Sequence, residues 1–206
     1  MNHPLMPVTV FLSGGGRSLA NLIEARNRGD LAVDFRLVIS SSSTVRGVQI
    51  ARDAGIETSI ITRSSHSDPI TYSEAMFTPC RDNGSALVVM AGFLKHVMIP
   101  EDFQARVLNI HPSLLPSFGG EGMYGHHVHE AAIKKGVKLS GCTVHYVDNH
   151  YDNGPILHQR SCPVLPSDDA NALAARVFEQ ECLALPEAIQ LHYEKWKAGG
   201  PDISDR

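Results

Sequence analysis

The feature that most constrains the fold of this chain is an alternation, repeated through its first half, of short apolar runs and longer stretches with helical spacing. Val8 to Leu12 is apolar and partly β-branched, and beyond the glycines at 14–16 apolar residues recur at helical spacing up to Gly29. Near-continuous apolar strands separated by helices are typical of a parallel sheet covered on both faces. We therefore predict an α/β fold: a Rossmann-like, mostly parallel twisted sheet with helices on both faces.

The remaining elements follow from the same reasoning. In the first half we expect further strands at 35–39, 58–62, 87–90 and 107–110, and helices at 47–55 and 72–83. In the second half we expect a Pro/Gly-rich loop at 112–125, a helix at 127–135, antiparallel strands at 141–147 and 156–164, and a long helix from Asp168 that Pro186 could bend. We see no repeat, low-complexity tract or linker, and we predict one domain over residues 1–206.

The composition excludes several classes of protein. The 206 residues carry a formal charge of −4 without a basic block, which argues against nucleic acid as a partner, because phosphate binding needs clustered Lys and Arg. No apolar run approaches the roughly 20 residues that cross a bilayer, and the N-terminus lacks the basic start of a signal peptide. The four cysteines are scattered without a CxxC pair. We expect a cytoplasmic protein without membrane partners, disulfides or a zinc knuckle.

A glycine-rich turn lies at the predicted ligand-binding edge of the sheet. Ligands of such sheets bind beyond the carboxyl ends of the strands, so the turn 13–16 and the segment 109–113 belong to one rim. Glycines at the start of a helix let backbone N–H groups approach an anion. The turn is neither a GxGxxG fingerprint nor a P-loop, and it could be a tight turn without a ligand. We favour phosphate binding, to which Arg17 could add charge unless it faces solvent.

Asn109 and His111 are the candidate catalytic pair. Residues two apart in an extended chain point the same way, so the amide and the imidazole face one ligand. An amide that stabilises an oxyanion and an imidazole that moves protons suit acyl transfer. A polar pair that merely closes a strand is the commoner outcome on spacing alone. Asp152 lies in an Asp-Asn-Gly turn, where a carboxylate near His111 would orient the ring and favour its charged form.

A cluster of histidines raises the possibility of a metal site. The cluster comprises His126, His127, His129, His145, His150 and His158. Its His-His-x-His part is a poor match, because side chains two apart on a helix diverge by roughly 200°. No HExxH signature is present. We predict chemistry without a metal.

Several motifs together carry a family resemblance. They are Ser-Gly-Gly-Gly at 13–16, Met-Ala-Gly-Phe at 90–93, Leu-Asn-Ile-His-Pro-Ser-Leu-Leu-Pro at 108–116, Gly-Cys-Thr-Val-His-Tyr-Val at 141–147, Tyr-Asp-Asn-Gly-Pro-Ile-Leu at 151–157 and Ala-Arg-Val-Phe-Glu-Gln-Glu at 175–181. In this order and spacing they cover essentially the whole chain, which resembles the phosphoribosylglycinamide formyltransferase family of folate-dependent enzymes. The resemblance implies formyl transfer from 10-formyltetrahydrofolate to the amine of glycinamide ribonucleotide, in purine synthesis.

The resemblance also implies roles for individual residues. Asn109, His111 and Asp152 fall on the family's catalytic residues, with the Asp holding the His protonated. Gly16, Arg17 and Ser18 fall on its phosphate-binding turn. The stretch that contacts the folate corresponds to Leu94, Lys95, His96 and Val97. Glu181 and His127 fall on substrate-binding positions. The N-terminal half would then bind the nucleotide, and the C-terminal half would bind folate and perform catalysis.

Three positions depart from the family's commonest pattern. The phosphate turn, often Gly-Ser-Asn, here ends in Arg17-Ser18. The family's folate-contacting arginine has no clear equivalent in the region 67–74. The loop 118–125 is longer than usual and could act as a lid or alter substrate preference.

The alternatives that remain are a formyltransferase for another amine, such as an amino-sugar nucleotide, and a non-catalytic nucleotide- or folate-binding module. The expected partners are small molecules, glycinamide ribonucleotide and reduced folate. We expect no nucleic acid and no membrane as partners, and either a monomer or a homodimer.

Overall fold

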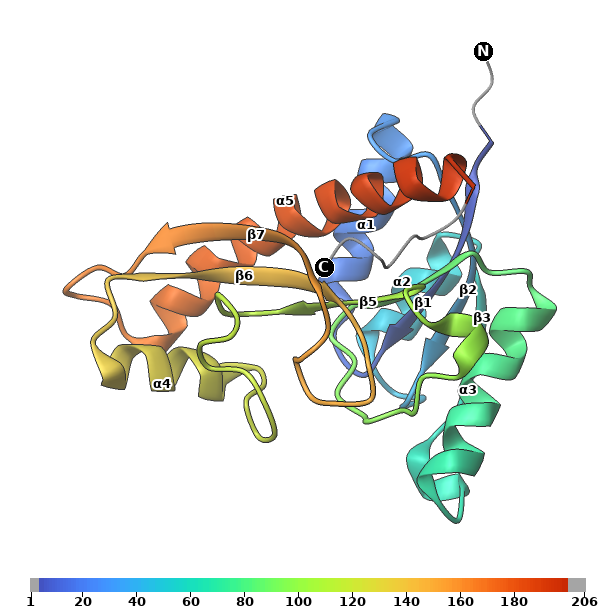
Figure 1. Ribbon diagram of the computed structural model, residues 1–206, viewed down its shortest axis with the longest axis horizontal. Coiled ribbons are helices and arrows are strands. Elements are labelled where there is room, and N and C mark those ends of the chain that lie inside the picture. Colours follow the sequence, from blue (N-terminus) through green and yellow to red (C-terminus); the bar gives the residue numbers. More distant parts are fainter. Residues whose placement is uncertain (1–3, 200–206) are drawn as a thin grey trace.

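The fold is built on one continuous seven-stranded sheet. The computed structural model describes residues 4–199 (Figure 1). The strands are β1 (Met6–Leu12), β2 (Val33–Ser40), β3 (Glu57–Ile60), β4 (Leu87–Met90), β5 (Val107–His111), β6 (Leu139–Tyr146) and β7 (Ile156–Pro163), in the spatial order β3-β2-β1-β4-β5-β6-β7. Neighbours from β3 to β5 pair in parallel, and the β5–β6 and β6–β7 pairs are antiparallel. The predicted α/β class, with antiparallel additions in the second half, is confirmed.

Helices cover both faces of this sheet. They are α1 (Arg17–Arg28), α2 (Arg46–Asp53), α3 (Pro69–Asp82), α4 (His126–Lys135) and α5 (Ala170–Lys197), with short 3-10 turns η1 (Arg63–Ser65) and η2 (Glu101–Phe103). One hydrophobic core joins the sheet to α1, α2, α4 and α5, and a second joins it to α3 and η2. In Figure 1 α5 and α1 accordingly lie on one side of the strands and α3 on the other.

The two cores follow from the alternation of side chains along a strand. Val8, Val10 and Leu12 of β1 point into the core of α1 and α5, whereas Phe11 points into the core of α3. All four side chains are fully buried. Phe11 packs edge-on against Phe77 of α3, with ring centroids 5.6 Å apart. Apolar side chains on both faces of β1 are therefore buried, and the strand is covered on both sides.

The start of α1 depends on a glycine. Gly16 caps the helix with a left-handed φ of 71°, a conformation that costs glycine little. A Cβ at Gly16 would lie 2.5 Å from the Cα of Gly47, so the position also permits a close approach between the starts of α1 and α2. The positive end of α1 is thereby fixed at the carboxyl rim of the sheet.

Some element boundaries differ from those that periodicity predicts. α3 begins at Pro69 rather than at Tyr72, because Asp68 caps it by accepting hydrogen bonds from Ile70 N and Thr71 N; proline at the first helical position needs no hydrogen bond there. β3 ends at Ile60, before η1. α5 continues as one helix through Pro186 to Lys197. Between residues 4 and 199 no helix has the length and apolar character needed to span a membrane.

Candidate active site

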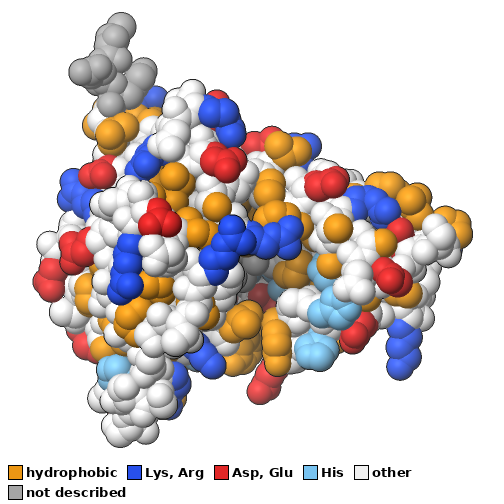
Figure 2. Space-filling model, turned by 180° about the vertical axis from the view of Figure 1, so that it is seen from behind, with side chains coloured by type: hydrophobic (Ala, Val, Ile, Leu, Met, Phe, Trp, Pro, Cys, Tyr) orange, Lys and Arg blue, Asp and Glu red, His pale blue; other side chains and the backbone are white. Residues whose placement is uncertain are grey.

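A cavity of about 430 Å³ opens at the carboxyl rim of β1, β4 and β5. Its walls come from the start of α1, the segment after β4, the end of β5, the loops after β5 and β6, and α5. On the face shown in Figure 2, histidine side chains gather beside a hollow near the centre. The rim position is the one expected for ligands of a parallel sheet.

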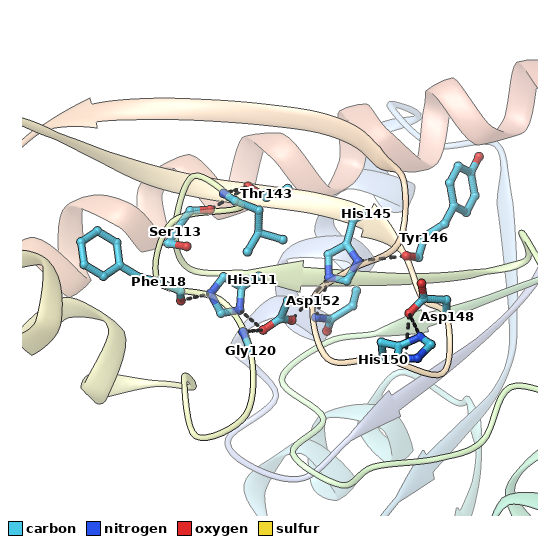
Figure 3. A network of polar contacts seen from close by, with 12 residues as sticks. His111, Ser113, Phe118, Gly120, Thr143, His145, Tyr146, Asp148, His150 and Asp152 are labelled. Carbon is cyan, nitrogen blue, oxygen red and sulfur yellow. Dashed lines mark hydrogen bonds and ion pairs between the residues drawn. The ribbon is translucent and has the colours of Figure 1, made fainter. Parts of the chain in front are cut away.

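Asn109, His111 and Asp152 meet in this cavity. Asn109 and His111 belong to β5, and Asp152 comes from the loop between β6 and β7. Nδ1 of His111 lies 3.4 Å from Oδ2 of Asp152, and Figure 3 shows the two side chains facing each other. Asp152 has a positive φ of 50°, and its Oδ2 also accepts a hydrogen bond of 2.9 Å from Gly120 N. Asp152, in the loop between β6 and β7, is thus held against His111 at the end of β5.

His145 is a fourth member of the cluster; the sequence suggests it only as a possible metal ligand and does not place it beside Asn109 and Asp152. It faces Asn109 across the antiparallel β5–β6 pair. Its Nδ1 donates to the carbonyl of Tyr146 at 2.9 Å, and its Nε2 lies 3.2 Å from Asn109 Nδ2, within hydrogen-bonding distance. The same Nε2 lies 3.6 Å from Oδ1 of Asp152. His145 therefore links the amide and the carboxylate of the candidate catalytic set.

Burial and the neighbouring polar groups act in opposite directions on the pKa values of His111 and Asp152. Burial lowers the pKa of His111, while the Asp152 carboxylate and the Phe118 carbonyl act in the opposite direction. The net direction differs from the expectation that Asp152 keeps the imidazole charged. Burial acts to raise the pKa of Asp152, but the His145 and His111 rings and the Gly120 N–H outweigh it and leave that pKa lowered. The free protein thus combines an ionised Asp152 with a His111 that favours its neutral form.

The loop between β5 and α4 lies against His111, the candidate catalytic histidine. His111 Nε2 donates to the carbonyl of Phe118 at 2.8 Å, and Phe118 itself has a positive φ of 55°. A Cβ at Gly119 would meet Leu115 Cδ2 and the Asp152 side chain, so only glycine fits between them without a shift. Gly120 and Gly122 also have positive φ values. Both ring nitrogens of His111 therefore face protein acceptors in this conformation.

A second set of polar residues lies at one end of the cavity, where α1 and α5 form the wall. Arg17 and Ser18 line this end, with Gly16 directly before them. The Arg17 guanidinium lies 3.5 Å above the Phe178 ring in the cavity wall, while the residue as a whole is exposed. Burial raises the pKa of Glu181 to about 7, with the charge of Arg17 acting against it. An arginine, a helix N-terminus and a carboxyl group thus share one end of the cavity.

The segment after β4 forms another wall. Leu94, Lys95, His96 and Val97 all line the cavity. The backbone N–H of Leu94 donates to Ser13 Oγ at 3.0 Å, which fixes this segment to the glycine turn. The His96 ring lies 5.0 Å from that of Tyr151, from the loop that carries Asp152. Two loops distant in sequence therefore place aromatic rings together at the mouth of the cavity.

The structure does not bring the side chain of His127, a predicted site residue, to the cavity. Its side chain is 62% exposed and lies near Glu130, while His126 and His129 line the cavity instead. His126 and His129, three apart, share one face of α4, and His127, one position further along the helix than His126, points away from that face. Burial lowers the pKa of His129 to about 4. Within 4–199 no group of three or more His, Cys, Asp or Glu side chains is placed to hold a metal ion.

The fold and the cluster together define a class of protein. A mostly parallel sheet holds an amide, an imidazole and a carboxylate at its carboxyl rim, beside an anion-binding type of helix start. This set can polarise a carbonyl group and move protons while one substrate attacks another. The arrangement is that of a group-transfer enzyme.

Comparison with known proteins identifies the family. The model of the formyl transferase family matches residues 6–189, and the chain belongs to this family. It is 39% identical to the chloroplastic phosphoribosylglycinamide formyltransferase of Vigna unguiculata, over 97% of this chain and 66% of that protein. It is 32% identical to the phosphoribosylglycinamide formyltransferase of Haemophilus influenzae, over 89% of this chain and 85% of that one. The crystal structure of glycinamide ribonucleotide transformylase 1 from Symbiobacterium toebii superimposes with a TM-score of 0.87 at 33% identity, over 92% of this chain and 88% of that one.

Proposed function

We propose that this protein transfers the formyl group of 10-formyltetrahydrofolate to the amine of glycinamide ribonucleotide. The products are formylglycinamide ribonucleotide and tetrahydrofolate, in de novo purine biosynthesis. The observation that carries this proposal is the meeting of Asn109, His111 and Asp152 in one cavity, with Arg17 and Glu181 at its other end. The names of the similar proteins support the choice of substrates.

Asn109 and His111 act on the formyl carbonyl. As the amine attacks the formyl carbon, negative charge develops on the formyl oxygen, and N–H donors placed there lower the barrier. The Asn109 amide has two N–H groups, of which His145 engages one, so the other is available to the oxygen. His111 Nε2 is the second donor once the Phe118 carbonyl releases it.

Asp152 and His111 manage the proton. The attacking amine loses one proton, and the departing nitrogen of the folate gains one, so the reaction has no net proton change. Because Asp152 is ionised and lies 3.4 Å from His111, it stabilises the imidazolium that forms when the ring takes up that proton. The lowered pKa of His111 in the free protein favours a neutral ring; because Nε2 carries the N–H that donates to the formyl oxygen, the ring takes up the proton at Nδ1, the nitrogen that faces Asp152.

The two ends of the cavity bind the two substrates. The Gly16-Arg17-Ser18 turn receives the ribonucleotide phosphate through backbone N–H groups and the Arg17 charge. Glu181 binds the glycinamide end. Leu94, Lys95, His96 and Val97 receive the reduced folate, which is the formyl donor and a co-substrate; no metal takes part in the proposed chemistry. His127, which lies outside the cavity, is left with a supporting role on α4.

Residues 1–206 act as one domain in this proposal, because the sheet runs unbroken from β3 to β7. We propose a cytoplasmic enzyme, monomeric or homodimeric, that binds neither nucleic acid nor membranes; the Vigna unguiculata relative is named as chloroplastic. An excess of acidic over basic side chains, 22 against 18, supports the exclusion of nucleic acid.

The preferred formyl acceptor distinguishes this proposal from the nearest alternative, a formyltransferase for an amino-sugar nucleotide. Purified protein with 10-formyltetrahydrofolate should formylate glycinamide ribonucleotide with a kcat/KM at least 100-fold above that for an amino-sugar nucleotide. The measurement is the release of tetrahydrofolate, with chromatographic identification of the formylated product. Preference for the amino sugar would reassign the substrate, and binding of both ligands without product would identify a non-catalytic module.

A further inference from the structure

The helices α1 and α5 face each other at one end of the cavity (Figure 1). Asn21 Nδ2 of α1 donates a hydrogen bond of 2.7 Å to the carbonyl of Cys182 on α5, which fixes the spacing of the two helices. Arg17 lies one turn before Asn21, and Phe178 lies one turn before Cys182, so this second pair belongs to the same facing sides. The Arg17 guanidinium accordingly lies 3.5 Å above the centre of the Phe178 ring.

Phe178 lies between two opposite charges. Glu181 follows it by three residues on the same face of α5, and both line the cavity. The charge of Arg17 reaches the Glu181 carboxyl, since it opposes the burial that raises the pKa of this group. Across residues 4–199, however, no carboxylate forms an ion pair with Arg17, whereas Arg176 on α5 is paired with Asp168. The arginine is thus stacked on the ring instead of being paired with the nearby acid.

The stacked position leaves the N–H groups of Arg17 to a ligand. The five N–H donors of a guanidinium lie in its plane, so a ring that covers its face leaves the donors at its edge accessible. Arg17 as a whole is exposed, and Phe178 is half-buried in the cavity wall. A long side chain loses conformational freedom when it binds a ligand, and a contact that orders it beforehand reduces that loss. The ring therefore holds a cation ready at this end of the cavity.

We propose that Phe178 is a positioning residue for the acceptor substrate: its ring holds Arg17 over the cavity for the substrate phosphate and keeps it from pairing with Glu181. The inference rests on the proposed function, in which one acceptor engages Arg17 through its phosphate and Glu181 through its glycinamide end. An ion pair between the two side chains would neutralise both, and the acceptor would have to break it before binding. Phe178 thereby favours acceptors that carry a phosphate and an amine together.

The first test measures the binding of ribose 5-phosphate, which has the phosphate but no amine. By calorimetry its Kd should increase about tenfold in Phe178→Leu, because an arginine without its ring pairs with Glu181. Glu181→Gln in the Phe178→Leu background should restore most of the affinity, because the competing carboxylate is gone. Phe178→Tyr keeps the ring and should bind as the wild type does. An unchanged Kd in Phe178→Leu, or no rescue by Glu181→Gln, would overturn the inference.

Three further variants control this measurement. Leu183→Ala is the matched control, because this leucine lies on the same helix, is 47% exposed and is not among the residues of the cavity wall; its Kd should equal that of the wild type. Phe178→Met fills more of the vacated space than leucine and covers the case in which circular dichroism shows Phe178→Leu to be unfolded. In an Arg17→Ala background Phe178→Leu should cause no further loss, because the ring acts through the arginine, and an additive loss would overturn the inference.

The second test follows the KM for glycinamide ribonucleotide between pH 8 and 6. In Phe178→Leu the new ion pair should lower the pKa of Glu181 below its value of about 7, because an opposite charge favours the ionised form. KM should therefore be about tenfold higher at pH 8, its increase on acidification should move to lower pH, and kcat should change less than KM.

Other titratable groups around Glu181 do not produce this shift. They are His126 and His129 of α4, Cys142 of β6 and Cys182 of α5. Burial lowers the pKa of His129 to about 4 and raises that of Cys142 to about 12, so neither titrates between pH 8 and 6. All four groups are the same in the wild type and in the variants, so the comparison isolates Arg17.

The two tests separate the inference from the proposed function. Product formation with the same KM profile in the wild type and in Phe178→Leu would overturn the inference and leave the function intact. Absence of product would overturn the function, and ribose 5-phosphate binding that depends on Phe178 and is rescued by Glu181→Gln would still uphold the role of the ring. A wild-type protein that binds no ribose 5-phosphate would overturn the inference whatever its activity.

Discussion

Asp152 is the residue on which the geometry of the site depends most. It faces His111 and His145 with its two oxygens, 3.4 and 3.6 Å away, and receives the N–H of Gly120. Asp152→Asn keeps the shape, and asparagine tolerates the positive φ of 50° that this turn requires. We expect kcat to fall about 10²- to 10⁴-fold, since the charge that stabilises the imidazolium is lost. Steady-state assays with a thermal-unfolding control measure this, and a kcat within twofold of the wild type would show that the carboxylate is not catalytic.

The proposed role of Glu181 predicts that substrate binding depends on pH. Burial raises its pKa to about 7, so the carboxyl group loses its charge as the pH falls below 7. If the ionised form binds the amine substrate, KM for glycinamide ribonucleotide should increase as the pH is lowered from 8 to 6. Glu181→Gln should have a high KM that varies less over this range, with a smaller effect on kcat. Identical KM profiles for the two proteins would remove Glu181 from the substrate site.

At the scale of elements, α3 offers a test of how its start is fixed. Asp68 accepts hydrogen bonds of 2.8 and 2.9 Å from Ile70 N and Thr71 N, and these bonds lower the pKa of its carboxyl group. Asp68→Ala should reduce the free energy of unfolding, because two N–H groups at the start of the helix lose their acceptor. Urea unfolding at pH 7 measures the change. Asp82→Ala, at the exposed last residue of the same helix, is the control and should be neutral or slightly stabilising, because an acid is unfavourable at a helix C-terminus.

The elements also show how far the sequence could predict the fold. The apolar runs at 8–12 and 87–90 have no polar face, and that pattern is sufficient to predict buried parallel strands. The same-facing pair Asn109 and His111 could be predicted from strand geometry alone. Where a helix starts depends on a cap, and the early start of α3 at Pro69 could have been found from Asp68-Pro69.

Other parts of the site depend on how elements are paired. His145 contacts Asn109 because β6 pairs with β5 in one particular register, and a shift by one residue would turn it to the other face. The contact between Phe118 and His111 depends on a backbone conformation with positive φ, which a phenylalanine gives no reason to expect. Arg17 and Phe178 meet from opposite ends of the chain. None of these contacts has a local sequence signal.

For the whole molecule, buried histidines predict sensitivity to acid. Burial lowers the pKa of His129 to about 4 and that of His192 to about 4. Unfolded histidines bind a proton near pH 6.5, so between pH 6.5 and 4 the unfolded state binds more protons than the folded state. The free energy of unfolding should therefore decrease on acidification across this window, by about 1.4 kcal/mol per pH unit for each histidine.

Urea unfolding at several pH values checks this dependence. His192→Gln should reduce the slope between pH 6.5 and 4, because one of the two buried rings is removed. His150→Gln is the matched control, since the His150 side chain is 80% exposed, and it should leave the slope unchanged. A wild-type protein whose stability is constant from pH 7 to 4.5 would contradict the burial of these rings in neutral form.

The decisive experiment follows the formyl carbon from one substrate to the other. Purified protein is mixed with 10-formyltetrahydrofolate labelled with carbon-13 in the formyl group and with glycinamide ribonucleotide, and the nucleotide is analysed by mass spectrometry. We expect the labelled formyl group on the nucleotide amine with the wild-type protein, and a rate lower by 10²-fold or more with His111→Ala of intact fold. A folded wild-type protein that leaves the nucleotide unlabelled, or a His111→Ala variant that labels it at the wild-type rate, would contradict formyl transfer at this site.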